Sequence, residues 1–557
     1  MDTPWWDPVH QTMWRFSGRS DLTGIARTAR AVAREVVAPA VAAGARSTQQ
    51  WTAEKASVLR ALDDAGLTSI VSNPSGGTAM PLAAALWELA WVDAGAAVCC
   101  MSGSLAHMAI RDIGTPEQRA RYLGNPARRH GALCLTEPLP GAGADAASLD
   151  GRIAVAEWKP GEQPLLTVEK RGRFTSHMDF AEFVAAAVHS RDPRFHGSCL
   201  VILEPTDAGV FERGDPVRKL GHQLSSTTNP AFQLQVPASR IAGGYSIEGD
   251  AIVPNFNHRE ALNATFRRAR AVMALVTSAK LLSALETFVG TPEQLLDIWA
   301  AGEAAASLGF SAARLSDDLD RAQAGRAALH RQAAAICPAA KLFSTEMASA
   351  MLPPAAAGPP ADKLIDAQLE AAYLGPAAIQ RRQISAFMID GAFLAEFAAW
   401  TREMRQLAAD APWTATVAAG MELWSWTLEG LRGANDSRGA PIYRDARQSI
   451  TFPMADALCW LLAARALTMD VLTLRNSTAY PFYSDLATVQ AVHASGQVAQ
   501  LCTGLLFGHN PQLTLPGGLR TTFAALRAKL NESFAGVMFV RQRAGEFIRQ
   551  LDVAANR

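Results

Sequence analysis

The chain has 557 residues, of which 49% are hydrophobic and 19% charged, and such a composition is ordinary for a soluble globular protein. Lys+Arg and Asp+Glu each number 52, so the formal net charge is zero. This balance argues against a chain whose whole surface binds nucleic acid or an anionic membrane, and the length allows roughly two to four domains.

The first residues, MDTPWWDPVH, are acidic and aromatic, and they do not resemble a secretory signal. Seven cysteines are scattered without a Cys-x-x-Cys pair, which is typical of a reduced compartment and predicts no zinc site. The most apolar early segment, residues 83–101, contains Glu88 and Asp93, so we expect a buried helix and no membrane span. We therefore expect a cytoplasmic protein without a metal.

Residues 1–130 are expected to form a helical domain. Periodic apolar positions predict a first helix capped by Asp21 and a second helix closed by Gly66. Residues 81–110 predict one long apolar helical stretch. The next helix should start at Thr115 as N-cap, with Pro116 in the first position.

After residue 130 the sequence pattern changes from helical segments to short segments typical of β-strands. At about residue 258 it changes back to long apolar segments typical of helices. The strand-like segments are FVAAAVHS, SCLVILEP and FQLQVP. We predict a mainly helical α+β fold. Its expected parts are an N-terminal helical domain (1–130), a middle β domain of barrel or sandwich type (131–250), a C-terminal helical bundle (251–412) and a helical extension (413–557).

Four segments, taken in order, carry a resemblance to a known family. They are GTPEQRARYL (114–123), LTEPLPGAGAD (135–145), KLGHQLSSTTNPAFQLQVPASRIAGG (219–244) and AAKLFSTEMAS (339–349). Residues 135–145 are similar to a Leu-Thr-Glu-Pro-x-Ala-Gly-Ser-Asp signature. Together the set resembles the acyl-CoA dehydrogenase flavoprotein superfamily over about residues 25–400.

The resemblance implies the chemistry of that family, in which a carboxylate removes the proton alpha to a thioester and the beta hydride passes to FAD. It implies that Thr136, with the backbone near Leu135, contacts the flavin ring. Phe174 would be an aromatic plate against the flavin, and Ser176 a hydroxyl that contacts the ring or a phosphate. The alternatives are a plain strand-to-turn connection and an ordinary strand.

The turn departs from the family signature in its second half. Leu139 and Pro140 look like an insertion, and Ala144 stands where the family has a serine that touches substrate. The substrate-facing half of the turn is therefore altered, whereas the flavin-facing half is kept.

In many family members the catalytic base is the glutamate of Tyr-Glu-Gly, nine residues after the arginine of an Arg-Asp pair. Asp390, followed by Gly391, stands nine residues after Arg381 and is our candidate base; its alternative is a helix-terminating Asp-Gly turn. The resemblance links an aspartate base to alicyclic thioesters. A second family position for the base has arginines here: Arg267 and Arg270 are candidates to pair a CoA phosphate or a substrate carboxylate, or they form a solvated charged face.

The family segment Arg-x-x-Phe-Gly, which contacts the FAD pyrophosphate, is only partly present. Phe288 and Gly290 are kept, but the arginine is missing. Residues 437–467 resemble the same segment with its following helix, which indicates either a partial helical duplication or an extension like those of some long-chain members. Reading YRDAR there as the Arg-Asp pair would put Pro453 at the base position.

The sequence thus predicts an FAD-dependent oxidoreductase of acyl-CoA dehydrogenase type, acting on a bulky alicyclic or aromatic-derived acyl-CoA. The expected partners are this thioester, an electron-transfer flavoprotein or similar acceptor, and further copies in a homodimer or homotetramer, with no nucleic acid. One alternative keeps the fold but changes the reaction to elimination, desulfination, decarboxylation or monooxygenation. The other is a non-catalytic relative that associates with DNA through residues 413–557, which the balanced charge disfavours.

Overall fold

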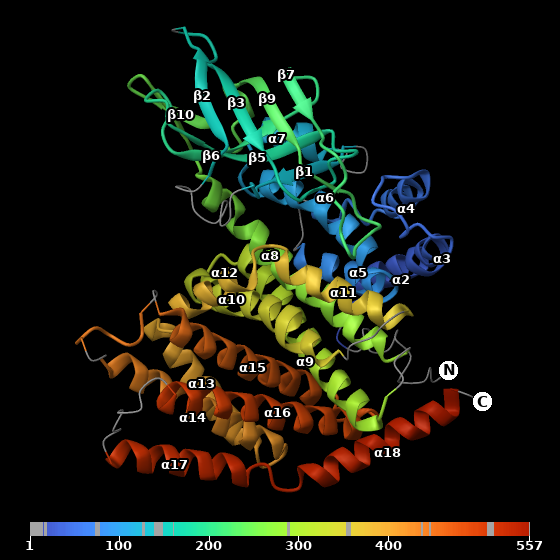
Figure 1. The fold of residues 1–557 in the computed structure, drawn as a ribbon, viewed down its shortest axis with the longest axis vertical. Coiled ribbons are helices and arrows are strands. Elements are labelled where there is room, and N and C mark those ends of the chain that lie inside the picture. The colour runs from blue at the N-terminus through green and yellow to red at the C-terminus, as the bar shows by residue number, and fades with distance from the viewer. Residues whose placement is uncertain are drawn as a thin grey trace. The chain divides into compact units, whose positions relative to one another are not determined.

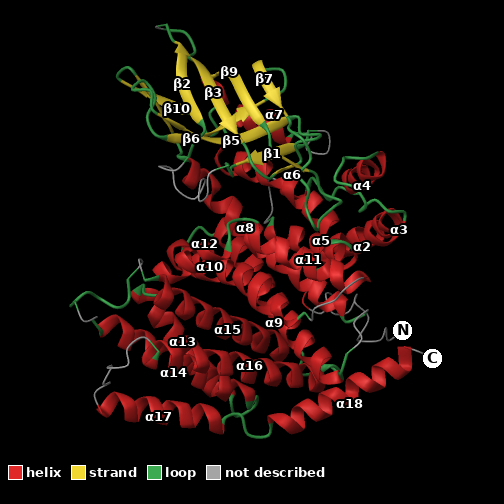
Figure 2. Cartoon of the chain, viewed as in Figure 1, coloured by secondary structure: helices red, strands yellow, loops and turns green. Residues whose placement is uncertain are grey.

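The structure, a computed structural model, describes residues 15, 19–72, 78–124, 129–138, 149–159, 161–286, 290–352, 358–435, 438–444, 447–508 and 517–555. The chain divides into two compact units. The N-terminal unit is Gly18–Ala269, and the C-terminal unit is Arg270–Arg557 with Met1–Ser17. The predicted fold class is confirmed: helices come first, strands follow, and helices return (Figures 1 and 2).

The N-terminal unit begins with short and long helices. They are α2 (Ser20–Val32), η2 (Ala33–Val37), α3 (Ala38–Ala42), α4 (Ala53–Asp64), η3 (Ile70–Ser72), α5 (Ala79–Val92), α6 (Ala94–Ile113) and α7 (Pro116–Leu123). Gly66, at φ 72°, ends the α4 segment as predicted. The predicted cap of the first helix is wrong, because Arg19 is the N-cap residue and Asp21 lies in the first turn, bound to the Arg19 guanidinium.

The long apolar stretch is two helices, because Asp93 interrupts it. Asp93 leaves the helical conformation at ψ 119°, and its carboxylate accepts the Ala96 N–H at 2.9 Å. A buried aspartate is therefore an N-cap here, which satisfies an end group that water cannot reach.

Eleven strands are described in the N-terminal unit. They are β1 (Gly131–Cys134), β2 (Arg152–Glu157), β3 (Leu165–Arg171), β4 (Thr175–Ser176), β5 (Phe183–Ser190), β6 (Ser198–Leu203), β7 (Ala208–Glu212), β8 (Thr227–Thr228), β9 (Ala231–Pro237), β10 (Tyr245–Glu248) and β11 (Ala251–Pro254). The main sheet has the order β1-β5-β2-β3-β9-β7, with β6 paired to β5. β1 and β2 run parallel to β5, and the other pairs of this sheet are antiparallel. Two small antiparallel pairs, β4 with β8 and β10 with β11, stand beside it.

Both faces of β5 are buried, and this explains its nearly continuous apolar sequence. One face, including Val184 and Val188, joins the core within the curled sheet. The other face, including Phe183 and Ala185, packs with residues of α6, α7 and the start of α8 (His258–Ala284). β1, which leads into the turn after Cys134, is thereby fixed between β5 and α6.

Helix α8 runs from the N-terminal unit into the C-terminal unit, whose other elements are helical. They are α9 (Pro292–Arg321), α10 (Arg326–Leu342), η7 (Phe343–Ala348), η8 (Ser349–Met351), α11 (Gly358–Ala372), α12 (Ala377–Phe387), α13 (Gly391–Leu407), α14 (Trp413–Gly433), α15 (Gln448–Leu472), α16 (Tyr480–Phe507), α17 (Gly517–Glu532) and α18 (Val537–Ala555). α9 packs against α10 and also against α15, α16 and α18. The predicted extension therefore shares a core with the predicted bundle.

Among the described helices α15 is long and apolar enough to cross a membrane, but 78% of its most apolar window is buried within the protein. α14 and α16 pack along it. The bent pair α12 and α13 passes the same length and composition test only when taken as one element.

All seven cysteines are free thiols and buried. Burial disfavours the thiolate and raises the pKa of Cys99 and of Cys502 to about 12. Cys99 and Cys100 lie in the segment 83–101 that the sequence predicted to be a buried helix, and both are buried.

The tetrapeptide Thr-Pro-Glu-Gln occurs twice in the chain. Comparing the two copies tests how burial changes the stabilisation that a helix N-cap provides. Residues 115–118 and 291–294 both form a complete capping box. Gln118 is buried, and its amide also donates to the carbonyls of Ser239 (2.9 Å) and Ile241 (2.8 Å), whereas Gln294 is exposed. We expect Gln118→Ala to lower the local opening free energy of α7 by about 3 kcal/mol, because two buried carbonyls lose their donors.

The matched variant Gln294→Ala should cost α9 about 0.5 kcal/mol, since water replaces the lost contacts. Hydrogen–deuterium exchange of the amides in each helix measures both values. Equal losses in the two helices would contradict the role given to burial.

Candidate functional site

The turn after β1 is built on a buried ion pair. Glu137 is 2% exposed, and its Oε1 lies 2.5 Å from Nζ of Lys170 on β3. The same carboxylate accepts the N–H groups of Asp150 (2.7 Å) and Gly151 (2.6 Å), which stand where the chain returns to β2. Lys170 Nζ also donates to the Leu135 carbonyl at 3.3 Å. Glu137, just after β1, therefore links the start of the segment between β1 and β2 to the end of that segment at Asp150 and Gly151.

A second turn, Arg173–His177, lies against the first. The Arg173 N–H donates to the Thr136 carbonyl at 2.8 Å, and the Phe174 N–H donates to Oδ1 of Asn229 at 2.9 Å. Phe174 has a left-handed backbone (φ 53°), and its side chain is 51% exposed. The Arg173 guanidinium stacks on this ring, 4.6 Å from its centroid. Hydrogen bonds from the backbone N–H groups of Arg173 and Phe174 thus hold this aromatic residue at the surface.

The structure brings together the four residues predicted to hold the flavin. Leu135 and Thr136 follow β1, whereas Phe174 and Ser176 belong to the turn that the Arg173–Thr136 hydrogen bond joins to it. Thr136 is exposed and Ser176 is half-buried. An exposed aromatic ring and two hydroxyl-bearing residues on two joined turns suit a planar, polar-edged heterocycle.

The predicted substrate-binding residues are more scattered. Ala144, in the altered half of the turn, lies outside the described residues, as does Phe288. Arg267 is half-buried on α8, and Arg270 is 8% exposed three residues later. Burial lowers the pKa of Arg270 to about 10.

Arg270 is engaged with the end of α11 in the C-terminal unit. Its Nε donates to the Leu374 carbonyl at 3.2 Å, and its Nη1 donates to Oε1 of Gln383 at 2.7 Å. Buried Lys341 donates to the carbonyls of Ala371 (2.6 Å) and Gly375 (3.1 Å). Two cations thus bind the carbonyls at the negative end of the α11 dipole, which is where cations stabilise a helix.

These cations hold an unusual backbone conformation. Leu374 is left-handed at φ 56°, followed by Gly375 at φ 93°. Burial, with Arg270 nearby, lowers the pKa of Lys341 to about 8. The sequence alone did not single out Lys341, because its partners are main-chain carbonyls that no residue type reveals.

The candidate base, Asp390, begins helix α13. It is the N-cap residue, exposed, and its Oδ1 accepts the Phe393 N–H at 3.0 Å. The Asp-Gly pair therefore starts a helix, whereas the alternative drawn from the sequence had it end one. The base assignment itself stays a prediction.

A further buried carboxylate, which sequence reasoning missed, lies in α11. Glu370 is fully buried; its Oε1 lies 2.5 Å from Nζ of Lys280 on α8, and its Oε2 accepts the Thr277 hydroxyl at 2.5 Å. Burial, together with Glu370 and Asp366, raises the pKa of Tyr373 in the same segment. Lys280 and Glu370 lie on separate helices, 90 residues apart in the sequence, so no local spacing in the sequence indicates this pair.

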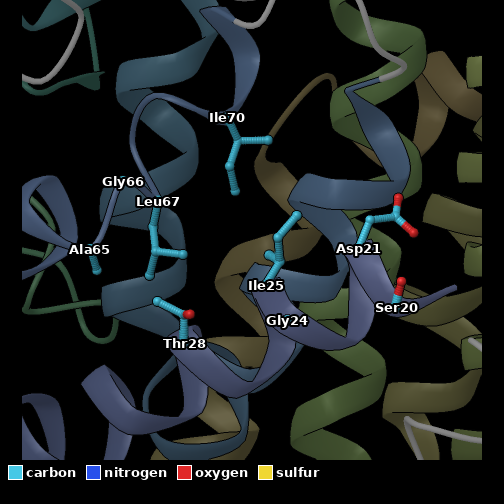
Figure 3. A pocket seen from close by; sticks show the side chains of 9 residues that line it. All are labelled: Ser20, Asp21, Gly24, Ile25, Thr28, Ala65, Gly66, Leu67 and Ile70. Atoms are coloured by element: carbon cyan, nitrogen blue, oxygen red, sulfur yellow. The ribbon is translucent and has the colours of Figure 1, made fainter.

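A separate open cleft of about 340 Å³ lies between α2 and the residues that follow α4. Ile25, Leu67 and Ile70 face its interior, and Asp21 stands at its edge (Figure 3). None of the predicted site residues lines this cleft.

Comparison with known proteins identifies the fold of this site. Residues 20–129 match the family model of the acyl-CoA dehydrogenase N-terminal domain. The short/branched chain specific acyl-CoA dehydrogenase, mitochondrial, of Bos taurus is 30% identical over 219 residues, which are 38% of this chain and 48% of that protein. The chain thus matches about half the length of this curated relative.

Solved structures extend the likeness to nearly the whole chain. An acyl-CoA dehydrogenase complexed with FAD from Bacillus anthracis superposes with a TM-score of 0.73 at 14% identity and covers 95% of this chain and 94% of its own. Butyryl-CoA dehydrogenase from Megasphaera elsdenii gives a TM-score of 0.53 at 20% identity, covering 66% of this chain and 98% of its own. Nitroalkane oxidase from Podospora anserina gives 0.52 at 15% identity, covering 67% and 96%. At these identities the structures show the fold alone.

Residues 20–129 match the N-terminal domain of the acyl-CoA dehydrogenase family, 219 residues align with one curated member, and the chain shares the fold of a solved member. The Bacillus anthracis structure covers most of residues 413–557 as well, so the extension is part of a fold that another solved protein shares. The predicted resemblance to this family is confirmed.

One further segment, Tyr373–Gly375, resembles the base segment of this family. Tyr373-Leu374-Gly375 matches the Tyr-Glu-Gly of the family base, and Leu374 stands nine residues after Ile365 of Ile365-Asp366. In this alignment, leucine replaces the glutamate and isoleucine the arginine. The left-handed turn held by Arg270 and Lys341 is therefore a second candidate for the base segment, and it has no carboxylate at its centre.

The Glu137–Lys170 pair yields a stability test. Glu137→Ala should destabilise the N-terminal unit by about 3–5 kcal/mol, because it leaves a buried ammonium group without its counter-ion. Glu137→Leu combined with Lys170→Met should cost clearly less than either single change, since no charge is then buried alone. Proteolysis in increasing urea measures the unfolding free energy, and strictly additive single losses would rule out the pairing.

Proposed function

We propose that this protein is an FAD-dependent oxidoreductase of acyl-CoA dehydrogenase type that acts on an acyl-CoA thioester. The observation that carries the proposal is the hydrogen bond from the Arg173 N–H to the Thr136 carbonyl, which joins the turn after β1 to the turn that carries Ser176 and the exposed Phe174 ring. The resemblance of the chain to the acyl-CoA dehydrogenase family supports the same conclusion.

The residues present fit a flavin. Phe174 offers an exposed face for stacking, and the hydroxyls of Thr136 and Ser176 can donate to ring heteroatoms or to a phosphate. When bound, FAD would supply the acceptor for a hydride. The Arg173 hydrogen bond to Thr136 keeps the two turns in register, so the aromatic face and the hydroxyls are preorganised before the ligand arrives.

For the substrate we propose a bulky alicyclic or aromatic-derived acyl-CoA, with Asp390 as the base that removes the proton alpha to the thioester. The exposed carboxylate of Asp390 and its fixed position at a helix start support this assignment. Arg267 would then face the CoA phosphates or a substrate carboxylate, whereas Arg270 supports the α11 turn. An electron-transfer flavoprotein or a similar acceptor would reoxidise the enzyme, and the assembly would be a homodimer or homotetramer.

Purified protein should be yellow and show a flavin absorption band near ~450 nm, since the proposed chemistry belongs to the cofactor. Thr136→Val and Ser176→Ala should each weaken flavin retention about tenfold, because each loses one hydrogen bond to the ligand. Thr167→Val, which changes a β3 hydroxyl away from the two turns, is the matched control. Protein that neither contains nor takes up FAD would refute the proposed function.

A second candidate function is favoured by Leu374. If the Tyr373–Gly375 turn is the family base segment, this chain has no carboxylate there, and its reaction does not begin with proton removal by that segment. A flavoprotein of the same fold that catalyses elimination, desulfination, decarboxylation or monooxygenation meets this condition.

Two variants separate the candidates. Asp390→Asn keeps an N-cap of equal quality, so α13 should stay intact, and turnover should fall by about 100-fold or more if Asp390 is the base. Leu374→Glu should instead create or strongly raise the bleaching of flavin by acyl-CoA if the α11 turn is the base segment. Anaerobic reduction by a panel of acyl-CoA thioesters measures both. Full turnover in Asp390→Asn removes Asp390 from the mechanism.

A further inference from the structure

His177 directly follows the residues of the proposed flavin site and is wholly buried. Its relative exposure is 0%, and its backbone is left-handed at φ 72°. Neither ring nitrogen makes a well-formed hydrogen bond to any described residue. The ring lies against Phe180, with centroids 4.6 Å apart, and near His130, with centroids 6.4 Å apart. The His177 imidazole is thus held in place by packing against its neighbours, without a well-formed hydrogen bond to either nitrogen.

Gly103 on α6 makes room for this ring. A Cβ atom added at Gly103 would stand 2.7 Å from Cε1 and 2.8 Å from Nδ1 of His177, well inside van der Waals contact. The imidazole therefore packs directly against the α6 backbone at Gly103. A side chain of any other residue type at position 103 would fill this space, which we call the seat of His177.

The turn needs such a support, because it contains two non-glycine residues in left-handed conformations. Phe174 and His177 flank the two residues of β4, and left-handed backbone is unfavourable for both. β4 itself has only the short pairing with β8 to hold it. Conformations of this kind persist when the surroundings over-determine them.

We propose that His177, seated on Gly103, is a positioning residue that fixes the Arg173–His177 turn in the shape that presents Phe174 and Ser176 to the ligand. This inference rests on the proposed function only for the identity of the ligand. The fixed shape of the turn is a property of the protein without it.

We expect acid to destabilise the Arg173–His177 turn, because the buried position of His177 disfavours a protonated imidazole. His107 from α6, His130 before β1 and Lys219 before β8 disfavour a charge on His177. The carboxylate near this cluster, Asp63 of α4, pairs with His130 at 3.1 Å. Burial, reinforced by His130, lowers the pKa of His177 to about 3, and only the Cys99 carbonyl opposes this. The released ring has an ordinary pKa of 6.5, so the seated state loses stability as the pH falls from 6.5 towards 3 and is unaffected above 6.5.

Hydrogen–deuterium exchange of the amides of residues 173–177 in the flavin-free full chain tests this. After correction for intrinsic exchange, protection should fall on the order of tenfold between pH 7.5 and pH 5 in the wild type. His177→Asn tolerates the left-handed backbone but lacks the ring, so protection should be low at both values and independent of pH. The exposed His196→Asn should behave as the wild type.

A double-mutant cycle checks the seat itself. Gly103→Ala should lower protection of the same amides about tenfold in the wild type and leave it unchanged in the His177→Asn background, because the clashing ring is then absent. Additive effects, unchanged protection in His177→Asn, or a pH response that persists in His177→Asn would each overturn the inference. Failure of the protein to bind FAD would refute the proposed function but would leave these exchange results unaltered.

Discussion

The buried ion pair between Glu137 and Lys170 is the interaction on which the candidate site depends. Both charges are removed from water, which is costly unless every polar atom finds a partner. The partners are the N–H groups of Asp150 and Gly151 and the Leu135 carbonyl, all of them main-chain groups of the connecting segment. These hydrogen bonds bring the two ends of the segment between β1 and β2 together. The Thr136 carbonyl is thereby placed where the Arg173 N–H can donate to it.

The C-terminal unit uses the same device with a different result. Lys341, like Lys170, is a buried lysine that binds main-chain carbonyls, and Leu374, like Phe174, is an apolar residue in a left-handed turn nearby. Arg270 and Lys341 hold the left-handed backbone at Leu374 through its own and neighbouring carbonyls. Lys170 instead closes the segment around Thr136, and the Phe174 turn is joined to that segment by the Arg173 N–H.

Local signals in the sequence were enough for most of the helices, for the buried strand β5 and for the resemblance to the acyl-CoA dehydrogenase family. The Thr-Pro-Glu-Gln caps at 115 and 291 formed as such patterns do, because they need only neighbours three residues away. Asp93 was harder, since an aspartate inside an apolar run gives no sign of whether it is paired or ends a helix. The Glu137–Lys170 pair joins residues 33 positions apart, and the supports of Leu374 are carbonyls, so neither leaves a local trace. Asp390 keeps the arginine, the nine-residue spacing and a carboxylate, whereas the Tyr373–Gly375 turn has leucine and isoleucine in place of the glutamate and the arginine, so the sequence favours Asp390.

The seven buried thiols have a practical consequence for anyone who wishes to follow this protein in motion. Because burial keeps them protonated and out of reach, alkylating dyes will find almost nothing to react with on the folded chain. A single cysteine introduced on an exposed helix of each unit would then be the sole attachment point there, without first removing the native ones. The chain is in effect already prepared for site-specific fluorescence or spin labelling, and distances between its two units can be followed as ligands are added.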